Sequence, residues 1–264
     1  MHIARQAGTV LLPYFHRRVK VEYKGDVDLV TEADRASEAL IVEQLRTWFP
    51  DHAVVAEEGS RLAGASAYRW HVDPLDGTTN FAHGFPVFAV SIALERAGEM
   101  VVGVVYDPTR DEMFVAEKGS GAHLNNQPLR VSSVGRLEEA LVTTGFPSRK
   151  RHKNPNIHLY HQLNMQTHGV RRPGSAALDL AYVAAGRMDG FWEIHLQPWD
   201  VAAGKLLVEE SGGCVTDMAG EPHRLDSASV VASNRLLHRP LLEALQEVFA
   251  GTYRAELPPL VRPA

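Results

Sequence analysis

The spacing of hydrophobic residues predicts two helices near the N-terminus. Apolar residues recur every three or four positions over residues 1–18. A second such segment follows Thr31, and Asp34 stands three positions further on, which is the pattern of a capping box at the start of a helix. Pro50 is expected to end this helix. Its apolar face is expected to consist of Ala33, Ala36, Leu40, Ile41, Leu45 and Trp48.

Strand-like patterns follow in the middle of the chain. Short apolar runs predict strands at 53–56 and 69–73. Longer runs at 87–94, 100–106 and 112–116 are separated by turns of only a few residues. Turns this short join antiparallel strands, so we expect an antiparallel meander.

The second half of the chain alternates between the two patterns. The expected strands are 141–144, 191–193 and 230–232, and the expected helices are 175–185, 200–211 and 236–249, with a polar segment at 147–155. The sequence therefore predicts an α+β half with an antiparallel sheet over residues 1–145. A smaller α/β half is expected over 146–264, with helices and sheets in alternating layers.

Composition and charge are those of an ordinary soluble globular protein. The 264 residues are 45% hydrophobic and 22% charged, with a net charge of −5. A mildly acidic chain makes nucleic acid an unlikely partner, and no apolar run approaches the ~20 residues that span a bilayer. The N-terminus lacks the pattern of a secretory signal, and the single cysteine, Cys214, fits a reducing compartment and a buried strand. We therefore expect a cytoplasmic protein.

The most distinctive segment is the acidic turn at residues 73–79, with the sequence DPLDGTT. An apolar strand runs directly into Asp73 and Asp76, and Pro74 between them restricts the turn. Both carboxylates and the Leu75 carbonyl can then converge on a hard cation such as Mg²⁺. The Gly-Thr-Thr that follows offers backbone N–H groups to a phosphate. An ordinary Asx turn is the alternative for such a pair, but the strand before it and the threonines after it favour the metal site.

Three further segments place acids where strands end or helices begin. Glu57 and Glu58 follow an apolar strand, Asp200 opens an expected helix, and Asp34 belongs to the capping box. Taken singly, each has an ordinary explanation, such as a solvated strand end or an N-cap. Together with the acidic turn they match the needs of two-metal phosphoryl chemistry.

In this arrangement the sequence resembles the inositol monophosphatase family, within the wider group of lithium-sensitive, metal-dependent sugar phosphatases. The resemblance rests on residues 28–34 (DLVTEAD), 56–58 (AEE), 73–81 (DPLDGTTNF), 174–177 (GSAA) and 199–204 (WDVAAG). They occur in family order and with spacing close to the family's, over roughly residues 20–235. The run at 171–182 is most similar to the bacterial branch.

The resemblance implies the fold of that family and a role for each matching residue. Two or three Mg²⁺ ions are expected, the first held by Glu57, Asp73 and the Leu75 carbonyl, and the second by Asp73, Asp76 and Asp200. A third ion would lie near Glu57. Thr78, oriented by Asp34, would position and help to deprotonate the attacking water. The residues expected at the phosphate are Gly77 and Thr78, and those on the sugar side are Gly174, Ser175, Ala176 and Glu193.

The implied activity is that of a phosphoric monoester hydrolase of the inositol-phosphate phosphatase type. Metal-activated water would attack inositol-1-phosphate, or a related polyol or sugar monophosphate, in line and without a phosphoenzyme. The same chemistry on histidinol phosphate, fructose-1,6-bisphosphate, NADP or a 3′-phosphonucleotide remains open, because the metal motif is common to all of them. Lys24 matches a family lysine on a loop that is one residue shorter here. Family members are usually homodimers.

A function of a different class is a regulatory protein that keeps the fold and binds a protein or RNA-machinery partner, as some bacterial members do. Its candidate surface is the basic run at 148–153 (SRKRHK), for which a solvated loop is the simpler interpretation. His158 and His161 share a helical face but lack further ligands, so surface histidines are favoured over a zinc site.

Overall fold

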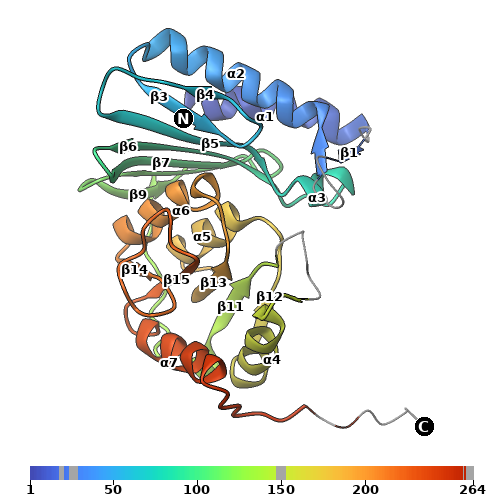
Figure 1. The fold of residues 1–264 in the computed structure, drawn as a ribbon, viewed down its shortest axis with the longest axis vertical. Helices are drawn as coiled ribbons and strands as arrows, with labels where there is room; N and C mark the ends of the chain where they lie inside the picture. The colour runs from blue at the N-terminus through green and yellow to red at the C-terminus, as the bar shows by residue number, and fades with distance from the viewer. Residues whose placement is uncertain (18–20, 24–28, 147–152, 258, 260–264) are drawn as a thin grey trace.

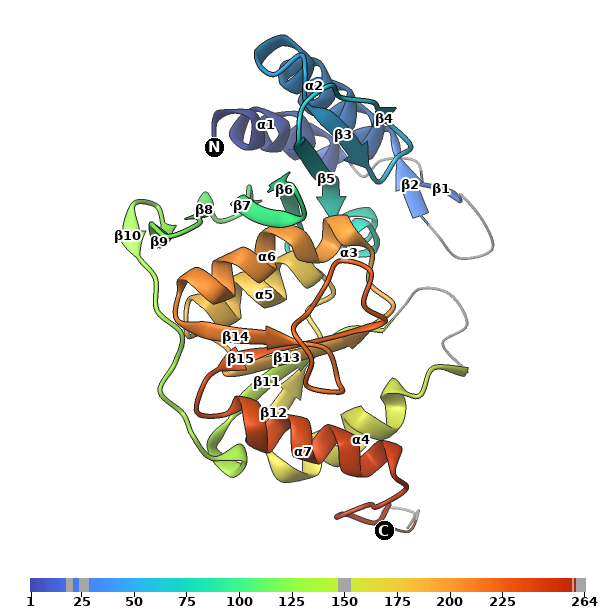
Figure 2. The same cartoon turned by 60° about the vertical axis from the view of Figure 1, so that its left-hand side comes forward.

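In the computed structural model, layers of helix and sheet alternate through the molecule (Figures 1 and 2). The structure describes residues 1–17, 21–23, 29–146, 153–257 and 259. The N-terminal helices cover an outer face of the larger sheet, and a central pair of helices separates this sheet from the smaller one. Helices α4 (Asn156–Gln166) and α7 (His238–Phe249) cover the far face of the smaller sheet. The helices are α1 (His2–Arg17), α2 (Glu32–Trp48), α3 (Thr78–Ala82), α4 (Asn156–Gln166), α5 (Ala176–Ala184), α6 (Pro198–Glu210) and α7 (His238–Phe249), with a 3₁₀ turn at Leu137–Glu139.

This arrangement confirms the alternately layered α+β and α/β fold expected from the sequence. No described helix combines the length and the apolar character needed to cross a membrane.

The larger sheet has eight strands in the order β10-β9-β8-β7-β6-β5-β3-β4. The predicted meander is confirmed, because β6, β7 and β8 pair antiparallel along their length. A fully antiparallel sheet was the wrong expectation: β3 and β5 run parallel, because the short strand β4 returns the chain before β5 begins. The strands are β3 (Ala53–Ala56), β4 (Arg61–Leu62), β5 (Tyr68–Asp76), β6 (Ala89–Arg96), β7 (Glu99–Asp107), β8 (Glu112–Glu117), β9 (Gly121–Leu124) and β10 (Gln127–Pro128); β1 (Val21–Tyr23) and β2 (Leu29–Thr31) form a separate antiparallel pair.

The smaller sheet has five strands in the order β12-β11-β13-β15-β14. Strand β11 runs parallel to both of its neighbours, whereas β15 is antiparallel to β13 and β14. Because β11 belongs to the smaller sheet, the segment that builds this sheet begins at Leu141, before the expected boundary at residues 145/146. The division of the chain into two halves at that boundary stays a proposal. The strands are β11 (Leu141–Thr144), β12 (Gly169–Arg171), β13 (Gly190–Ile194), β14 (Gly213–Thr216) and β15 (Ser229–Asn234).

Three hydrophobic cores fill the spaces between the layers. The middle core joins α5 and α6 to both sheets, so the central helices are apolar around most of their circumference. Trp48 departs from the expected apolar face of α2, since it is 66% exposed at the end of that helix. Cys214 lies in β14 as expected, but it is only partly buried.

The beginnings of two helices show what local sequence determines. The capping box of α2 is confirmed: the Thr31 N–H donates to Asp34 at 2.8 Å, and the Thr31 hydroxyl accepts from the Ala33 N–H at 3.1 Å. Helix α6 begins at Pro198, two positions before the expected start at Asp200. Asp200 is therefore the third helical residue rather than the N-cap, and its carboxylate accepts from the Gln197 N–H at 2.8 Å.

Helix α6 lies directly against the larger sheet because a glycine faces it. A Cβ atom on Gly103 of β7 would stand 2.7 Å from the Ala203 carbonyl oxygen of α6 and 3.1 Å from its Cα. Both are backbone atoms and cannot rotate away. The separation of the central helices from the sheet therefore depends on the absence of a side chain at this position.

We expect Gly103→Ala to destabilise the protein by about 1–3 kcal/mol, because the added methyl group overpacks a contact between two backbones. Thermal unfolding measures the effect. Gly135→Ala is the matched control, because a Cβ atom there meets nothing closer than Leu236 Cβ at 3.5 Å. Equal melting temperatures for the Gly103 variant and wild type would contradict this description of the layer contact.

Candidate active site

Strand β5 carries the acidic turn and is fixed at its end by helix α2. The strand continues to Asp76, beyond the predicted end at residue 73, and its register with β6 shifts between Asp73 and Asp76. The Leu75 N–H donates to the Asp73 carboxylate at 2.9 Å, and the hydroxyl of Ser37 on α2 donates to the Pro74 carbonyl at 2.9 Å. The irregular strand end is thus held in one conformation.

Gly77 turns the chain from β5 into α3. Its φ of +96° is in the left-handed region, and a Cβ atom would come within 2.9 Å of the Val87 carbonyl oxygen. The short helix expected after it is confirmed as α3. Phe81 anchors this helix, since it is buried and its ring contacts Phe15 and Phe88 at centroid distances of 5.5 and 4.9 Å.

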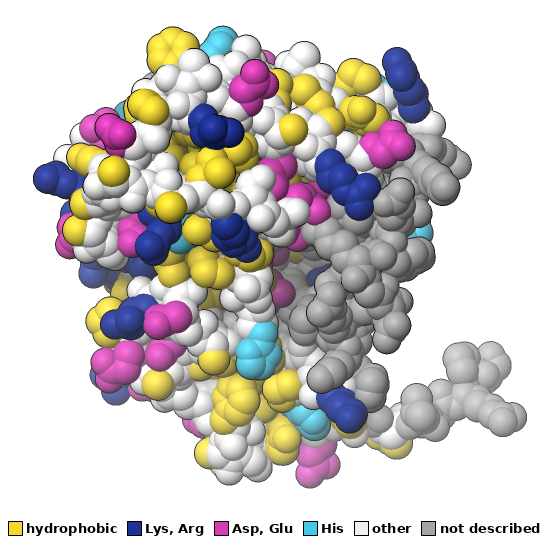
Figure 3. Space-filling view, turned by 45° about the horizontal axis from the view of Figure 1, so that its top comes forward, with side chains coloured by type: hydrophobic (Ala, Val, Ile, Leu, Met, Phe, Trp, Pro, Cys, Tyr) yellow, Lys and Arg dark blue, Asp and Glu magenta, His cyan; other side chains and the backbone are white. Residues whose placement is uncertain are grey.

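One cavity of about 530 Å³ brings the expected site residues together. On the face of the molecule shown in Figure 3, acidic side chains gather where the surface is hollowed. Asp34 is the exception, because it is buried behind the cavity wall and contacts it through Thr78. The lining includes Glu57, Asp73, Leu75, Asp76, Gly77, Thr78, Gly174, Ser175, Ala176, Glu193 and Asp200.

Helix α2 supports the acidic turn and the loop that carries Glu57 through buried polar residues on one face. Asp34 accepts a hydrogen bond from the Thr78 hydroxyl at 3.1 Å. Glu38 accepts from the N–H groups of Glu58 and Ser60 at 2.7 and 3.0 Å, and so fixes the loop that carries Glu57. Sequence reasoning missed Ser37 and Glu38. The sequence spacing did indicate them, because residues 34, 37 and 38 fall on one face of the predicted helix. In the structure all three are buried.

Carboxyl groups that line the cavity destabilise the charged forms of their neighbours. Burial raises the pKa of Asp73 well above its usual range, and the negative charges of Glu57, Asp76 and Asp200 raise it further. Burial also raises the pKa of Asp200 strongly, with Asp76 and Glu57 contributing. For Asp76 burial again raises the pKa, although hydrogen bonds from the chain oppose the rise. Such a cluster retains protons unless a cation compensates the charge.

The donors fit a hard divalent cation. Carboxylates and a main-chain carbonyl are the oxygen ligands that Mg²⁺ takes. One oxygen of each aspartate accepts a hydrogen bond from the protein, from the Leu75 N–H to Asp73, the Ser175 hydroxyl to Asp76 and the Gln197 N–H to Asp200. The Asp73 carboxyl group also hydrogen-bonds to the side chain of Glu57, and among the described residues no three acids already stand as a ligand set around one point. Binding would therefore require small side-chain rotations.

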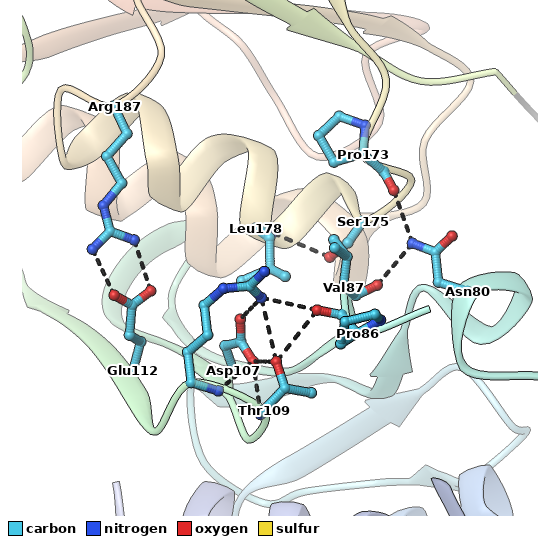
Figure 4. A network of polar contacts seen from close by, with 11 residues as sticks. Asn80, Pro86, Val87, Asp107, Thr109, Glu112, Pro173, Ser175, Leu178 and Arg187 are labelled. Carbon is cyan, nitrogen blue, oxygen red and sulfur yellow. Dashed lines mark hydrogen bonds and ion pairs between the residues drawn. The ribbon is translucent and has the colours of Figure 1, made fainter. Parts of the chain in front are cut away.

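The two halves of the site are joined by direct hydrogen bonds. Asp76 accepts from the Ser175 hydroxyl at 2.6 Å and from the Ala177 N–H at 2.7 Å. Figure 4 shows Asn80 of α3 between Val87 and Pro173, and its amide donates to their carbonyl oxygens at 2.7 and 2.8 Å. These contacts fix the start of α5 beside the acidic turn. Nothing in the local sequence around Asn80 indicates this second role.

Two further acids line the cavity from the second half of the chain. Glu193 of β13 is buried, and burial followed by the charge of Asp76 raises its pKa to about 8, which Arg172 opposes. Asp179 of α5 also lines the cavity, and burial raises its pKa well above the usual range. Sequence reasoning assigned no role to Arg172 or Asp179, nor to His195, which lines the cavity with a φ of +62°.

Some expected features lie outside the described residues or away from the cavity. Lys24 and Asp28 are outside the described part of the chain, as are residues 148–152 of the basic run. His158 and His161 are on α4, where the first contacts Tyr253 and the second is hydrogen-bonded to Gln162 at 3.0 Å.

Comparison with known proteins shows which family the chain belongs to. The sequence model of the inositol monophosphatase family matches residues 1–250. The chain belongs to the inositol monophosphatase family. The resemblance inferred from the motifs is confirmed, and so is the assignment to the phosphatase class of hydrolases. The family is metal-dependent, which accords with the carboxylates in the cavity.

Curated members of the inositol monophosphatase family similar to this chain have two kinds of name. An inositol-1-monophosphatase of Mesorhizobium japonicum is 48% identical, covering 88% of each chain. A protein of Pseudomonas aeruginosa named Nus factor SuhB is 46% identical, covering 93% of this chain and 94% of its own. Among solved structures, the extragenic suppressor protein SuhB of Bartonella henselae is 44% identical with a TM-score of 0.89, covering 93% of this chain and 96% of its own.

The raised pKa of Glu193 predicts a pH-dependent stability in the absence of metal. The folded protein keeps a proton on Glu193 up to about pH 8, whereas the unfolded chain loses it near pH ~4.3. The contribution to stability is therefore complete below that lower pKa and is lost as the pH rises towards 8. The free energy of unfolding of the wild type should therefore fall by on the order of a few kcal/mol over this pH range. Glu193→Gln has no proton to lose at this position, so we expect it to lack this fall.

Denaturant unfolding in EDTA between pH 5 and 8.5 measures this difference. Glu138→Gln is the control, since Glu138 is exposed. Wild type and the Glu193 variant should diverge as the pH rises, while the control follows wild type. Parallel curves for all three proteins would refute the buried-acid interpretation.

Proposed function

We propose that this chain is a Mg²⁺-dependent phosphomonoesterase that acts on inositol-1-phosphate or a related small polyol or sugar monophosphate. The supporting observation is a single cavity lined by two kinds of group. Glu57, Asp73, Asp76, Asp200 and the Leu75 carbonyl form an acidic group of possible metal ligands, and Glu193 lines the same cavity from β13. A phosphate between them would meet the backbone at Gly77 and Thr78, while its polyol group would reach Glu193.

Two or three Mg²⁺ ions would be held by this acidic group. Glu57, Asp73 and the Leu75 carbonyl suit one ion, and Asp73, Asp76 and Asp200 suit another, with a third near Glu57. When bound, such ions lower the pKa of water and offset charge on the phosphoryl oxygens. The chain's own part is to hold these oxygens at fixed positions, which Ser37 and Glu38 support from α2.

Thr78 and Asp34 provide a path for the proton of the attacking water. The Thr78 hydroxyl lies 3.1 Å from both an Asp34 carboxylate oxygen and the Leu75 carbonyl oxygen. When its one hydrogen is donated to Asp34, its lone pairs can accept a hydrogen bond from water in the cavity. Burial raises the pKa of Asp34, opposed by hydrogen bonds from Thr31 and Thr78. A higher pKa makes the carboxylate a better proton acceptor. The proton would pass from water to Thr78 as Thr78 gives its own to Asp34, for in-line attack without a phosphoenzyme.

The cavity lining around Glu193 favours an uncharged hydroxyl-bearing group over a second phosphate. Arg172 is the cation described there, and it interacts with both Glu193 and Asp179. Two acids offset its charge, which disfavours fructose-1,6-bisphosphate. Histidinol phosphate, NADP and a 3′-phosphonucleotide remain alternatives with the same chemistry. A homodimer, sensitivity to lithium and a cytoplasmic location remain proposals as well.

Asp76→Asn tests the assignment of the site. One oxygen of Asp76 accepts the hydrogen bonds from the Ser175 hydroxyl and the Ala177 N–H, so an asparagine carbonyl can keep these two bonds and preserve the fold. Loss of the charge should reduce hydrolysis by about 10³-fold or more, in line with the loss of a preorganised electrostatic group. The measurement is phosphate release from a panel of phosphomonoesters with Mg²⁺.

The same panel with EDTA is the control for metal dependence, and thermal unfolding checks that the variant is folded. Full activity of the variant would rule out the proposed metal ligands. Absence of Mg²⁺-dependent release from every ester by wild type would rule out the enzyme function itself.

A regulatory binding protein is the second candidate, favoured by the relative named Nus factor SuhB. Binding to a protein or RNA-machinery partner would then use the basic run at 148–153 rather than the cavity. Replacement of the basic residues in this run should abolish capture of the partner, whereas Asp76→Asn should leave it unchanged. The opposite pattern would place the partner at the cavity and exclude this candidate surface.

A further inference from the structure

The carboxylate of Glu193 lies against the backbone of the glycine that directly follows the neighbouring strand. Strands β11 and β13 are parallel, and Thr144 at the end of β11 pairs with Trp192, next to Glu193. The residue after β11 is Gly145, where a Cβ atom would stand 2.2 Å from one carboxylate oxygen of Glu193 and 2.5 Å from the other. The position of Glu193 is therefore set by where the Gly145 backbone lies.

A single amide side chain holds this strand end. Asn156 donates from Nδ2 to the Gly145 carbonyl oxygen at 2.6 Å and to the Thr144 hydroxyl at 3.0 Å. Its Oδ1 accepts from Trp192 Nε1 at 2.7 Å. The Thr144 hydroxyl completes the ring by donating to the Trp192 carbonyl at 2.6 Å. Asn156 thus connects the end of β11 with β13, the strand that carries Glu193.

Asn156 does this from outside the cavity. It is the first residue of α4, it is fully buried, and its own N–H donates to the Asn154 side chain at 2.8 Å. The cavity lining includes Gly145 and Glu193 but not Asn156. Any effect of Asn156 on the substrate must therefore pass through the residues that it holds.

We propose that Asn156 is a positioning residue: by fixing the Gly145 carbonyl it places Glu193 against the hydroxyl groups of the substrate's polyol. This inference rests on the proposed function and goes beyond it, since it assigns part of the substrate affinity to a residue on α4. Removal of the amide leaves the Gly145 carbonyl and the Trp192 N–H buried without their partner, so the strand ends must move to recover hydrogen bonds. A shift of this kind moves the Glu193 carboxylate, whereas none of the hydrogen-bond partners of Asn156 belongs to the acidic turn.

The test compares two substrates in Asn156→Ala. Myo-inositol 1-phosphate presents hydroxyl groups to Glu193, whereas phenyl phosphate has none. We expect the KM for inositol phosphate to rise about tenfold or more, with kcat/KM for phenyl phosphate within about twofold of wild type. Gln162→Ala is the matched control, because Gln162 is another buried amide on α4 that forms hydrogen bonds to the Ala255 backbone at 2.6 and 3.0 Å.

Gly145→Ala provides a second variant that should show the same split between substrates, because the new methyl group displaces Glu193 directly. Equal losses on both substrates for the Asn156 and Gly145 variants, or the same pattern in the Gln162 control, would overturn the inference and indicate a general structural defect. Wild-type kinetics in the Asn156 variant would overturn it as well. A wild-type protein that hydrolyses neither ester would instead overturn the proposed function, and this inference with it.

Discussion

Repulsion among buried carboxylates is the constraint on which the site depends. Asp73, Asp76 and Asp200 are brought into one cavity with Glu57. Burial raises the pKa of all three aspartates, and the charges of neighbouring acids raise those of Asp73 and Asp200 further. A protein gains nothing in stability from such a cluster alone. A divalent cation converts the same arrangement into a favourable one, and we therefore attribute the cluster to metal-dependent chemistry.

The layered fold supplies the rigidity that the cluster requires. Helix α2 holds the ends of two strands through Ser37 and Glu38, and α6 contributes Asp200 from its first turn. Because α6 lies directly on the larger sheet at Gly103, the position of Asp200 follows from the packing of the central layer. The cavity thus forms where strand ends of both sheets meet the starts of the central helices.

Local sequence was sufficient for the features that local interactions determine. The capping box at Thr31 and Asp34 and the acidic turn could be predicted because each consists of residues a few positions apart. The parallel pairing of β3 with β5 could not, since it depends on the path of the chain between them. Glu38, Asn80 and Asn156 were missed for a related reason, as their partners lie on other elements. Asp200 was found, but its helix begins earlier because Pro198 suits the first helical position.

Diffraction from a crystal containing Mn²⁺ in place of Mg²⁺ shows whether the carboxylate cavity holds catalytic divalent ions. We expect at least two anomalous peaks in the cavity, one beside Glu57, Asp73 and the Leu75 carbonyl, the other beside Asp73, Asp76 and Asp200. A cavity without such peaks, in which these carboxyl groups remain hydrogen-bonded to the protein and to one another, would contradict this expectation.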